Sequence, residues 1–517
     1  MRIGIDVGGT HTDAVLLDNA NILASVKAPT SKDVVTGVIS ALTNILQGQQ
    51  VDTIDAVMIG TTQFTNAVVE RRQLAEVAAI RIGLPSGVDI PPMTAWPDDI
   101  ADAIGRHTYM IDGGFLYDGW PLAELNNQQI QGVIDDIKEK NITNVAIAAA
   151  FSPMNAQPEH AVAEAIKAQI PNVRITLSYQ MGRLGILERE NAAILNASLL
   201  PFADIVVSAF QNALKDQGLS CPMFISQNDG TLMNAKFVRQ YPALTFASGP
   251  TNSLRGASQL TGLKNAIVVD IGGTTSDIGV LQEGFPRESN MVIEVGGVRT
   301  NFRMPDIQAV AMGGGSHISS DGNKIGPQSV GHQLLQKGLI FGGETLTATD
   351  IAVAHANLDI GDHAKVATLP SELVKRATDN MHELLDRHID MMKPNSEPVP
   401  VILVGGGSVL ISEDLKTASE IIRPENAAVA NAIGAAIAQI GGEAEQFVSY
   451  REVSRDDAIS MVTQKARQSA IEAGADANSL TVVDIEETAI PYMDDGNTRV
   501  RVKVIGEVAK LVKQEAN

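Results

Sequence analysis

One short motif occurs twice in the chain, each time directly after an apolar run. Asp-Val-Gly-Gly-Thr-His-Thr-Asp spans Asp6–Asp13, and Asp-Ile-Gly-Gly-Thr-Thr-Ser-Asp spans Asp270–Asp277. The apolar runs predict buried strands, and the paired glycines permit a tight turn that a ligand can approach closely. The repeat therefore predicts two matching β-hairpins in different parts of the chain, not the stacked units of a solenoid.

The residue types in both copies suit phosphate chemistry, because backbone N–H groups and a threonine hydroxyl can cradle phosphate oxygens. A single copy is also compatible with an ordinary hairpin turn. Two matching copies favour the functional interpretation. The predicted phosphate-binding residues are Gly8, Gly9, Thr10, Thr12, Gly272, Gly273, Thr274 and Thr275.

Four aspartates, two in each motif, are the candidate catalytic residues. They are Asp6, Asp13, Asp270 and Asp277. A carboxylate at a strand end can hold Mg²⁺ or Mn²⁺ directly or through water, so we assign Asp6 and Asp270 to the metal, with Asp306 as a further ligand. Asp13 or Asp277 is suited to orienting water or substrate, and the sequence leaves open which carboxylate acts as the general base.

Composition describes a multidomain α/β protein. The chain has 517 residues, 44% of them hydrophobic and 19% charged, which suggests about three or four domains. Its net charge of −21 opposes binding to nucleic acid or to an anionic membrane. A nucleotide is still compatible with this charge, because a divalent cation and local N–H groups reverse the field at a phosphate site.

The cysteine content, the N-terminal sequence and the apolar runs together predict a cytoplasmic protein. Cys221 is the single cysteine, which excludes an internal disulfide and fits a reducing compartment. The chain enters its first motif at once, so we expect no secretory signal. The longest apolar candidates, Val145–Phe151 and Ala427–Ile440, are too short or too interrupted for a membrane span.

The rest of the chain alternates predicted helices and strands. Helices at 126–140 and 158–170 alternate with strands at 144–150 and 174–178, which predicts βαβ units on a parallel or mixed sheet. Residues 83–118 are predicted to be a loop-rich surface segment near a cleft. A long helical segment at 185–218, broken at Pro201, is predicted to connect two halves.

Two further glycine turns are candidate ligand sites. Gly405, Gly406, Gly407 and Ser408 follow a predicted strand at 401–404, and alone they would be an ordinary strand-to-helix loop. Gly313–Ser316 offers consecutive N–H donors for a phosphate or a developing oxyanion, or else is a packed glycine loop. Ser248 is a plausible N-cap of a following helix.

The two hairpins, the Gly405–Ser408 turn and the small-residue helix at Asn431–Ala436 occur in an order that resembles the actin, sugar-kinase and heat-shock-chaperone superfamily. The resemblance implies an α/β fold with two actin-like (ribonuclease H-like) ATPase domains flanking a nucleotide cleft. It also implies that the hairpins grip ATP phosphates and metal, and that Gly405–Ser408 and Asn431 bind adenosine. The expected segments are residues 1–184 and 248–445 as the two halves, 185–247 as the connector, and 446–517 as a small α/β appendage.

Within that superfamily the chain is more closely similar to the hydantoinase A and 5-oxoprolinase family. Besides the two hairpins, the matching motifs are Gly60-Thr61-Thr62 with Thr65-Asn66-Ala67, Glu188–Asn191, Ser248-Gly249-Pro250 and Gly313–Ser316. The sequence departs from the family where His11 replaces the usual aromatic residue, and at Ala311-Met312-Gly313. His11 is a candidate substrate or metal contact, with a structural hydrogen bond as the alternative.

The resemblance implies an ATP-dependent hydrolase that opens a cyclic amide or imide such as a hydantoin, 5-oxoproline or a lactam. Phosphoryl transfer to the amide oxygen would make the ring carbon electrophilic for water, a step that needs mainly positioning and charge neutralisation. A B-type subunit is an implied partner, and a homo-oligomer is possible. The alternatives are a small-molecule kinase and an ATP-switched regulatory module. The predicted substrate-side residues are His11, Gly60, Thr61, Thr62, Asn66, Gly314, Gly315 and Ser316.

Overall fold

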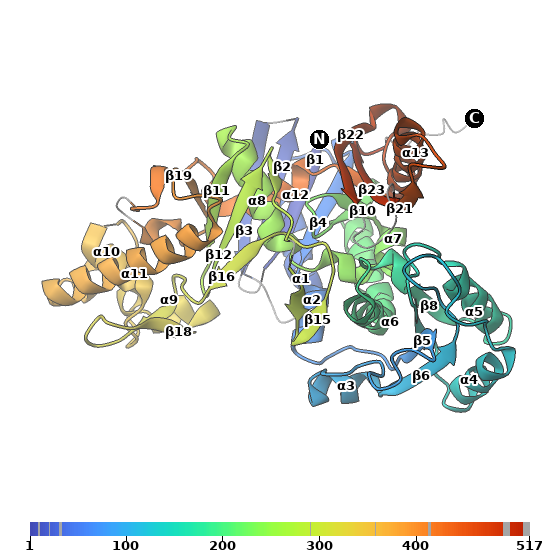
Figure 1. Cartoon of the computed structure of the whole chain (residues 1–517). Helices are drawn as coiled ribbons and strands as arrows, with labels where there is room; N and C mark the ends of the chain where they lie inside the picture. Colours follow the sequence, from blue (N-terminus) through green and yellow to red (C-terminus); the bar gives the residue numbers. More distant parts are fainter. Residues whose placement is uncertain are drawn as a thin grey trace.

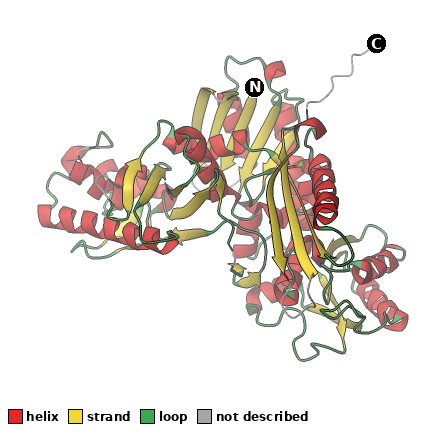
Figure 2. Cartoon of the chain, turned by 45° about the horizontal axis from the view of Figure 1, so that its top comes forward, coloured by secondary structure: helices red, strands yellow, loops and turns green. Residues whose placement is uncertain are grey.

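The chain forms a mixed α/β structure with three main sheets and two halves that meet at a pair of central helices (Figure 1). Figure 2 shows the helices packed around the sheets of each half. The structure is a computed structural model, and it describes residues 1–8, 11–19, 21–29, 34–289, 291–356, 358–411, 415–489 and 497–509.

The first half is built on a nine-stranded sheet. Its strand order is β22-β23-β21-β10-β9-β4-β1-β2-β3. The strands are β1 (Arg2–Val7), β2 (His11–Asp18), β3 (Asn21–Pro29), β4 (Ala56–Thr61), β9 (Met223–Ser226), β10 (Leu232–Asn234), β21 (Ile440–Ser449), β22 (Thr481–Ala489) and β23 (Asn497–Gly506). β1 pairs antiparallel with β2 and parallel with β4, so the first hairpin lies inside the sheet, between β4 and the edge strand β3.

The C-terminal segment is an extension of this sheet rather than a separate unit. β21 pairs with β23 along ten residues and joins the first half through β10. Helix α13 (Arg455–Ala473) covers one face, where the small side chains of Ala466 and Ala470 let it approach the sheet closely. The small α/β appendage predicted at 446–517 therefore contributes its strands to the sheet of the first half.

The second half has a six-stranded sheet with the order β13-β12-β11-β19-β20, and β16 pairs with β12. Its strands are β11 (Ala266–Ile271), β12 (Ser276–Gln282), β13 (Phe285–Pro286), β16 (Ile307–Val310), β19 (Val399–Val404) and β20 (Ala418–Ile422). Helices α10 (Ala348–Ala356) and α11 (Ser371–Met392) pack on it through an apolar stripe. The small elements β17 (Ser316–Ile318), β18 (Ile325–Ser329) and α9 (Leu334–Lys337) lie beside it.

A third, four-stranded sheet carries the predicted βαβ units. β5 (Ala78–Leu84), β6 (His107–Asp112), β7 (Asn144–Ala149) and β8 (Arg174–Leu177) are all parallel in the order β6-β5-β7-β8. The connecting helices are α3 (Asp98–Ile104), α4 (Asn127–Glu139) and α5 (Gln157–Lys167). The segment 83–118 is thus less loop-rich than predicted, since it contains α3 and β6.

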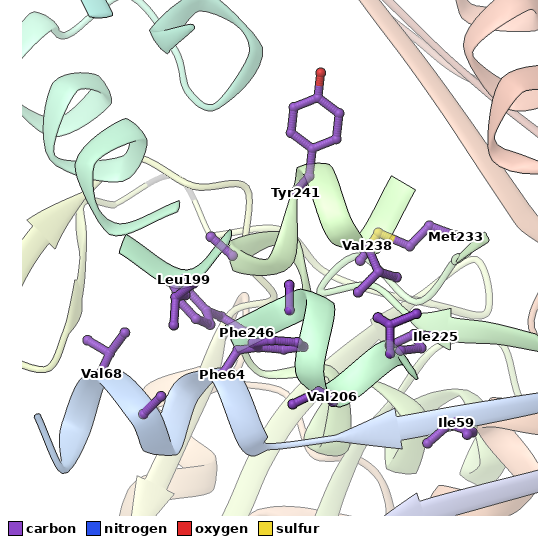
Figure 3. Packing of buried hydrophobic residues seen from close by; sticks show 14 of the residues in the cluster. Ile59, Phe64, Val68, Leu199, Val206, Ile225, Met233, Val238, Tyr241 and Phe246 are labelled. Carbon is purple, nitrogen blue, oxygen red and sulfur yellow. The ribbon is translucent and has the colours of Figure 1, made fainter. Parts of the chain in front are cut away.

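The helix predicted to connect two halves is instead the core of the first. α6 (Ile186–Asp216) runs unbroken through Pro201 and packs with α1 (Val34–Ile45), α2 (Gln63–Val69) and α7 (Ala235–Gln240). Figure 3 shows Phe64, Leu199 and Phe246 meeting in this core. Among the described residues, α6 has the length and apolar composition of a membrane span, and 67% of that stretch is buried inside the fold.

Two short helices cross between the halves with their backbones in contact. α8 (Ser248–Thr261) packs on the second sheet, and α12 (Ala430–Ile437) packs on the first. A methyl group on Gly256 would overlap the carbonyl oxygen of Ala430, and one on Gly434 would overlap that of Asn252. Both glycines are therefore required by close approach. α8 begins after Ala247, which has a left-handed φ of 58°, and Ser248 bonds to the Thr61 carbonyl instead of capping the helix as predicted.

A segment of the second half crosses over to pack in the first. Between β13 and β16, the strands β14 (Ile293–Val295) and β15 (Val298–Thr300) lead into Phe302, which is buried in the core of the first half. Its ring stands edge-on to Phe246 at a centroid distance of 5.4 Å. Arg71 and Asn191 donate to the Gly296 and Arg299 carbonyls. The predicted segment 248–445 is therefore not self-contained, because this strap belongs to both halves.

Candidate functional site

The two predicted hairpins are closed by matching hydrogen bonds. In the first, the Gly8 N–H donates to the His11 carbonyl at 3.0 Å, and in the second the Gly272 N–H donates to Thr275 at 2.9 Å. Asp6 lies directly opposite Asp13 across the first ladder, as Asp270 lies opposite Asp277 across the second. The repeat in sequence is therefore a repeat in backbone structure.

Asp6 is held by groups from three other elements. Its neighbour across the parallel ladder is Gly60, where any side chain would overlap the Asp6 carboxylate. Asn431 of α12 donates to Asp6 Oδ2 at 2.9 Å, and Asn252 of α8 donates to Oδ1 at 3.5 Å. Burial, aided by the nearby Asp13 charge, raises the pKa of Asp6 to about 7.

Asp270 has an equivalent setting in the second half. Gly405, with a φ of 82°, lies where a side chain would overlap the Asp270 carboxylate, and the Ser253 hydroxyl donates to Oδ2. Burial raises the pKa of Asp270 above its ordinary value. Asn252 and Ser253 are adjacent on α8, so one helix turn reaches the leading aspartate of each hairpin. The two aspartates therefore face the same space between the halves.

This pair of carboxylates fits a hard divalent cation. Asp6 and Asp270 are withdrawn from water and repel one another, which a cation would relieve. Within the described ranges no group of three or more His, Cys, Asp or Glu side chains could hold a metal. A cation here would therefore keep several waters or take ligand oxygens, as Mg²⁺ commonly does.

Asp13 and Asp277, the second aspartate of each motif, differ in their hydrogen-bond partners. Asp13 is buried and accepts two hydrogen bonds from the Lys27 ammonium, at 2.9 and 3.1 Å, and one from Asn431 at 3.2 Å. Asp277 makes no side-chain hydrogen bond or ion pair with the part of the chain that the structure describes. Burial and the neighbouring Asp270 charge raise the pKa of Asp277 to about 7. Asp277 is therefore the carboxylate that stays available to a ligand.

The predicted phosphate-binding residues fall into three groups. Gly272, Gly273, Thr274 and Thr275 form the second turn, in which both threonines are exposed. Thr12 does not fit the predicted phosphate contact, because its side chain is buried and points to Gly37 of α1. Gly9 and Thr10 lie outside the described residues.

The structure does not bring Asp306 to the aspartate cluster. Its carboxylate pairs with Arg287 at 2.6 Å, and its N–H donates to the Arg287 carbonyl. It precedes β16 opposite the Gly279 end of β12, about 10 Å along the strand from Asp277 by the usual strand rise. The prediction of a metal ligand at Asp306 is therefore wrong.

The glycine loop at 313–316 supports the second hairpin instead of binding substrate. The Gly314 and Gly315 N–H groups donate to the Gly272 and Gly273 carbonyls, at 3.0 and 2.7 Å. Ser316 is fully buried and its hydroxyl accepts from the Gly313 N–H. Because these donors are already used, the structure favours the packed-loop alternative.

The other predicted substrate-side residues differ in burial and in their hydrogen-bond partners. Gly60 serves to accommodate Asp6, and the Thr61 side chain is buried with its hydroxyl accepting from Gln63. Asn66 donates to the Thr62 hydroxyl at the surface of α2. His11 begins β2 with an exposed ring, where desolvation and the Lys27 charge lower its pKa.

Some of the residues predicted to bind adenosine are exposed, and others are buried or already hydrogen-bonded. Gly406 is exposed and faces open space, whereas Gly407 donates to the Ile271 carbonyl at 2.7 Å and Ser408 is buried. The Gly405–Ser408 turn is thus fastened to the second hairpin, and its exposed face stays a prediction for adenosine. Asn431 lies beside the first hairpin, where its amide donates to Asp6 and Asp13.

Three residues of the site carried no recognisable signal in the sequence. Lys27 lies on β3, and Asn252 and Ser253 follow Ser248-Gly249-Pro250 on α8. The register of the first hairpin with a third strand would have placed Lys27 opposite Asp13. The reach of α8 to both hairpins depends on a tertiary crossing that no local pattern encodes.

Comparison with known proteins shows which family this sequence matches. Residues 2–170 match the family model of the hydantoinase/oxoprolinase N-terminal region, and residues 189–372 match that of hydantoinase/oxoprolinase. Caprolactamase subunit alpha of Pseudomonas jessenii is 26% identical over 396 residues, covering 71% of this chain and 55% of that protein. The acetophenone carboxylase gamma subunit of Aromatoleum aromaticum is 25% identical over 409 residues, covering 69% and 53%. The chain spans about half the length of the curated relatives it matches.

Solved structures show the same fold. The ATP-dependent caprolactamase from Pseudomonas jessenii superposes with a TM-score of 0.80 at 19% identity, covering 98% of this chain and 88% of that one. Nucleotide-free acetone carboxylase superposes with a TM-score of 0.68 at 18% identity, covering 99% and 88%. The two family models together account for more than half of the sequence, so this chain belongs to the hydantoinase/oxoprolinase family.

Proposed function

We propose that the chain is an ATP-dependent hydrolase that opens a cyclic amide or imide, acting as the A-type component of its enzyme. The observation that carries the proposal is the facing pair of aspartate hairpins, with Asp6 and Asp270 both reached from one turn of α8. Family membership and the names of two relatives, a caprolactamase and an ATP-dependent caprolactamase structure, support the choice of substrate class.

The chemistry needs ATP because a ring amide is a poor electrophile. The amide oxygen attacks the γ-phosphorus and ADP leaves, giving an imidate phosphate in which the phosphoryl group is on the former amide oxygen and the ring carbon is open to attack by water. The C–N bond then breaks with the nitrogen leaving as an amine, and a second water releases phosphate. The product is an open-chain acid, with ADP and phosphate. Positioning and charge neutralisation supply most of the catalysis of the first step.

The residues divide these tasks between the two hairpins. The Gly8 turn and the Gly272–Thr275 turn hold the phosphates from opposite sides, and the exposed Gly406 face lies toward adenosine. Asp6 and Asp270 would hold Mg²⁺ or Mn²⁺, which would neutralise charge on the phosphates. Asp277 is assigned to orienting water or substrate, because Asp13 is already held by Lys27 and Asn431.

A partner subunit is part of the proposal. Two relatives are named as an alpha and a gamma subunit, and this chain spans about half of each. A B-type hydantoinase subunit would then complete the enzyme, and a homo-oligomer is compatible with it. A cytoplasmic location fits the single cysteine, Cys221.

Product analysis tests the proposal. The protein is incubated with MgATP and a panel of hydantoins, 5-oxoproline and lactams, with and without a B-type subunit, and phosphate and organic products are measured. We expect one ring-opened product and one free phosphate for each ADP. A phosphorylated organic product would instead identify a kinase. ATP binding without turnover on any substrate or partner would identify a regulatory module.

A further inference from the structure

Lys27 brings a positive charge to the aspartates of the cleft. Its ammonium lies 2.9 and 3.1 Å from the two carboxylate oxygens of Asp13, which is opposite it in the ladder between β2 and β3. Its charge also acts on Asp270, across the cleft in the second half. The side chain is 37% exposed, so it is accessible from solvent.

The same ammonium group reaches beyond the first half. It donates at 3.2 Å to the carbonyl of Ala428, which lies in the short turn between β20 and α12. The preceding carbonyl, that of Ala427, accepts from the Gly405 N–H at 2.9 Å. A chain of three contacts therefore joins Asp13 in the first hairpin to Gly405, the first residue of the predicted adenosine turn.

We propose that Lys27 is a positioning residue of the nucleotide cleft, which ties Asp13 to Ala428 and so sets the spacing between the phosphate end and the adenosine end. The inference rests on the proposed function only in requiring that the cleft binds ATP. An ammonium group suits the role because it carries three donors on a flexible stem. Without it, Asp13 would be a buried carboxylate with one amide partner, facing the phosphates with an uncompensated charge.

The test compares Lys27→Met, which keeps the length of the side chain and removes its charge, with Lys27→Arg, which keeps the charge. Lys375→Met is the matched control, since Lys375 pairs with Asp379 on the exposed surface of α11. For each protein we would measure the Kd for MgATP by calorimetry, the thermal midpoint, and amide hydrogen exchange at residues 427–431 without nucleotide.

We expect Lys27→Met to raise the Kd for MgATP about tenfold, a modest effect because the ion pair is partly exposed. Exchange at residues 427–431 should become faster, and the thermal midpoint should fall because buried Asp13 loses its counter-ion, although the protein should stay folded. Lys27→Arg should recover most of the affinity. Wild-type affinity in Lys27→Met would overturn the inference. So would a loss of affinity that accompanies general unfolding and is not restored by arginine.

The outcomes separate this inference from the proposed function. If the wild-type protein binds MgATP but opens no cyclic amide, the hydrolase assignment fails while the effects of Lys27→Met still decide the role of Lys27. If the wild-type protein does not bind MgATP, both are contradicted.

Discussion

Asp270→Asn is expected to lower ATP turnover about 100-fold or more while leaving the protein folded. Asparagine keeps the shape of the side chain and its acceptor toward Ser253, but it removes the negative charge that a divalent cation and its phosphates require. The loss should fall mainly on kcat and on the dependence on Mg²⁺, because the hairpin backbone is unchanged.

The same substitution should not lower stability. Withdrawal from water raises the pKa of Asp270 in the folded state, so its ionised form opposes folding near neutral pH. The folded protein then holds this proton more tightly than the unfolded chain does. Asp270→Asn should therefore unfold at an equal or higher denaturant concentration than wild type at pH 7 with EDTA present. That difference should fade as the pH falls toward about 4.

Asp306→Asn is the control for a carboxylate outside the cluster. Asp306 is paired with Arg287, so its substitution should cost a little stability and leave the Mg²⁺ dependence of turnover as in wild type. Undiminished turnover in Asp270→Asn would contradict the two-hairpin account. Equal losses in both variants would contradict the separation of Asp306 from the metal site.

Gly256→Ala is expected to destabilise the protein by about 3 kcal/mol, at the upper end of the range for overpacking. The added methyl group would overlap the carbonyl of Ala430, which is backbone and cannot rotate away. Relief requires α8 and α12 to separate, and that movement would draw Asn252 and Asn431 away from Asp6. Affinity for MgATP should fall together with stability.

A glycine-to-alanine substitution at an open position should instead raise the free energy of unfolding. Gly132 lies in the exposed middle of α4 with no atom within 4 Å of an added methyl group, so Gly132→Ala should stabilise by about 0.5–1 kcal/mol. Urea unfolding of both variants measures the difference. A Gly256→Ala protein with the wild-type midpoint would show that the two helices are not in close contact in solution.

The local parts of the fold could be predicted from the sequence because local patterns determine them. The paired glycines and flanking aspartates predicted both hairpins, and the strand before Gly405 was predicted from its apolar run. The strap carrying Phe302 could not be predicted, because its partners lie far away in sequence and its apolar residues have no distinctive period. The joining of β21 to β10 was missed for the same reason.

The site shows the same division between local and tertiary information. The prediction for Asp6, Asp13, Asp270 and Asp277 rested on the repeat, and the structure brings Asp6 and Asp270 to one space. A ligand contact was predicted at Gly313–Ser316 because the sequence does not show whether consecutive N–H groups are free. In the structure, two of them are bonded to Gly272 and Gly273. Asp306 was predicted as a metal ligand because no local sequence pattern, apart from charge, identifies Arg287 as its partner.

The most direct measurement of the central claim is a crystal structure of the protein grown with Mg²⁺ and a nonhydrolysable ATP analogue. The account predicts that the β- and γ-phosphates lie between the Gly8 turn and the Gly272–Thr275 turn, with the cation beside Asp6 and Asp270. Phosphates that contact one hairpin alone, or an analogue bound away from the space between the halves, would contradict it.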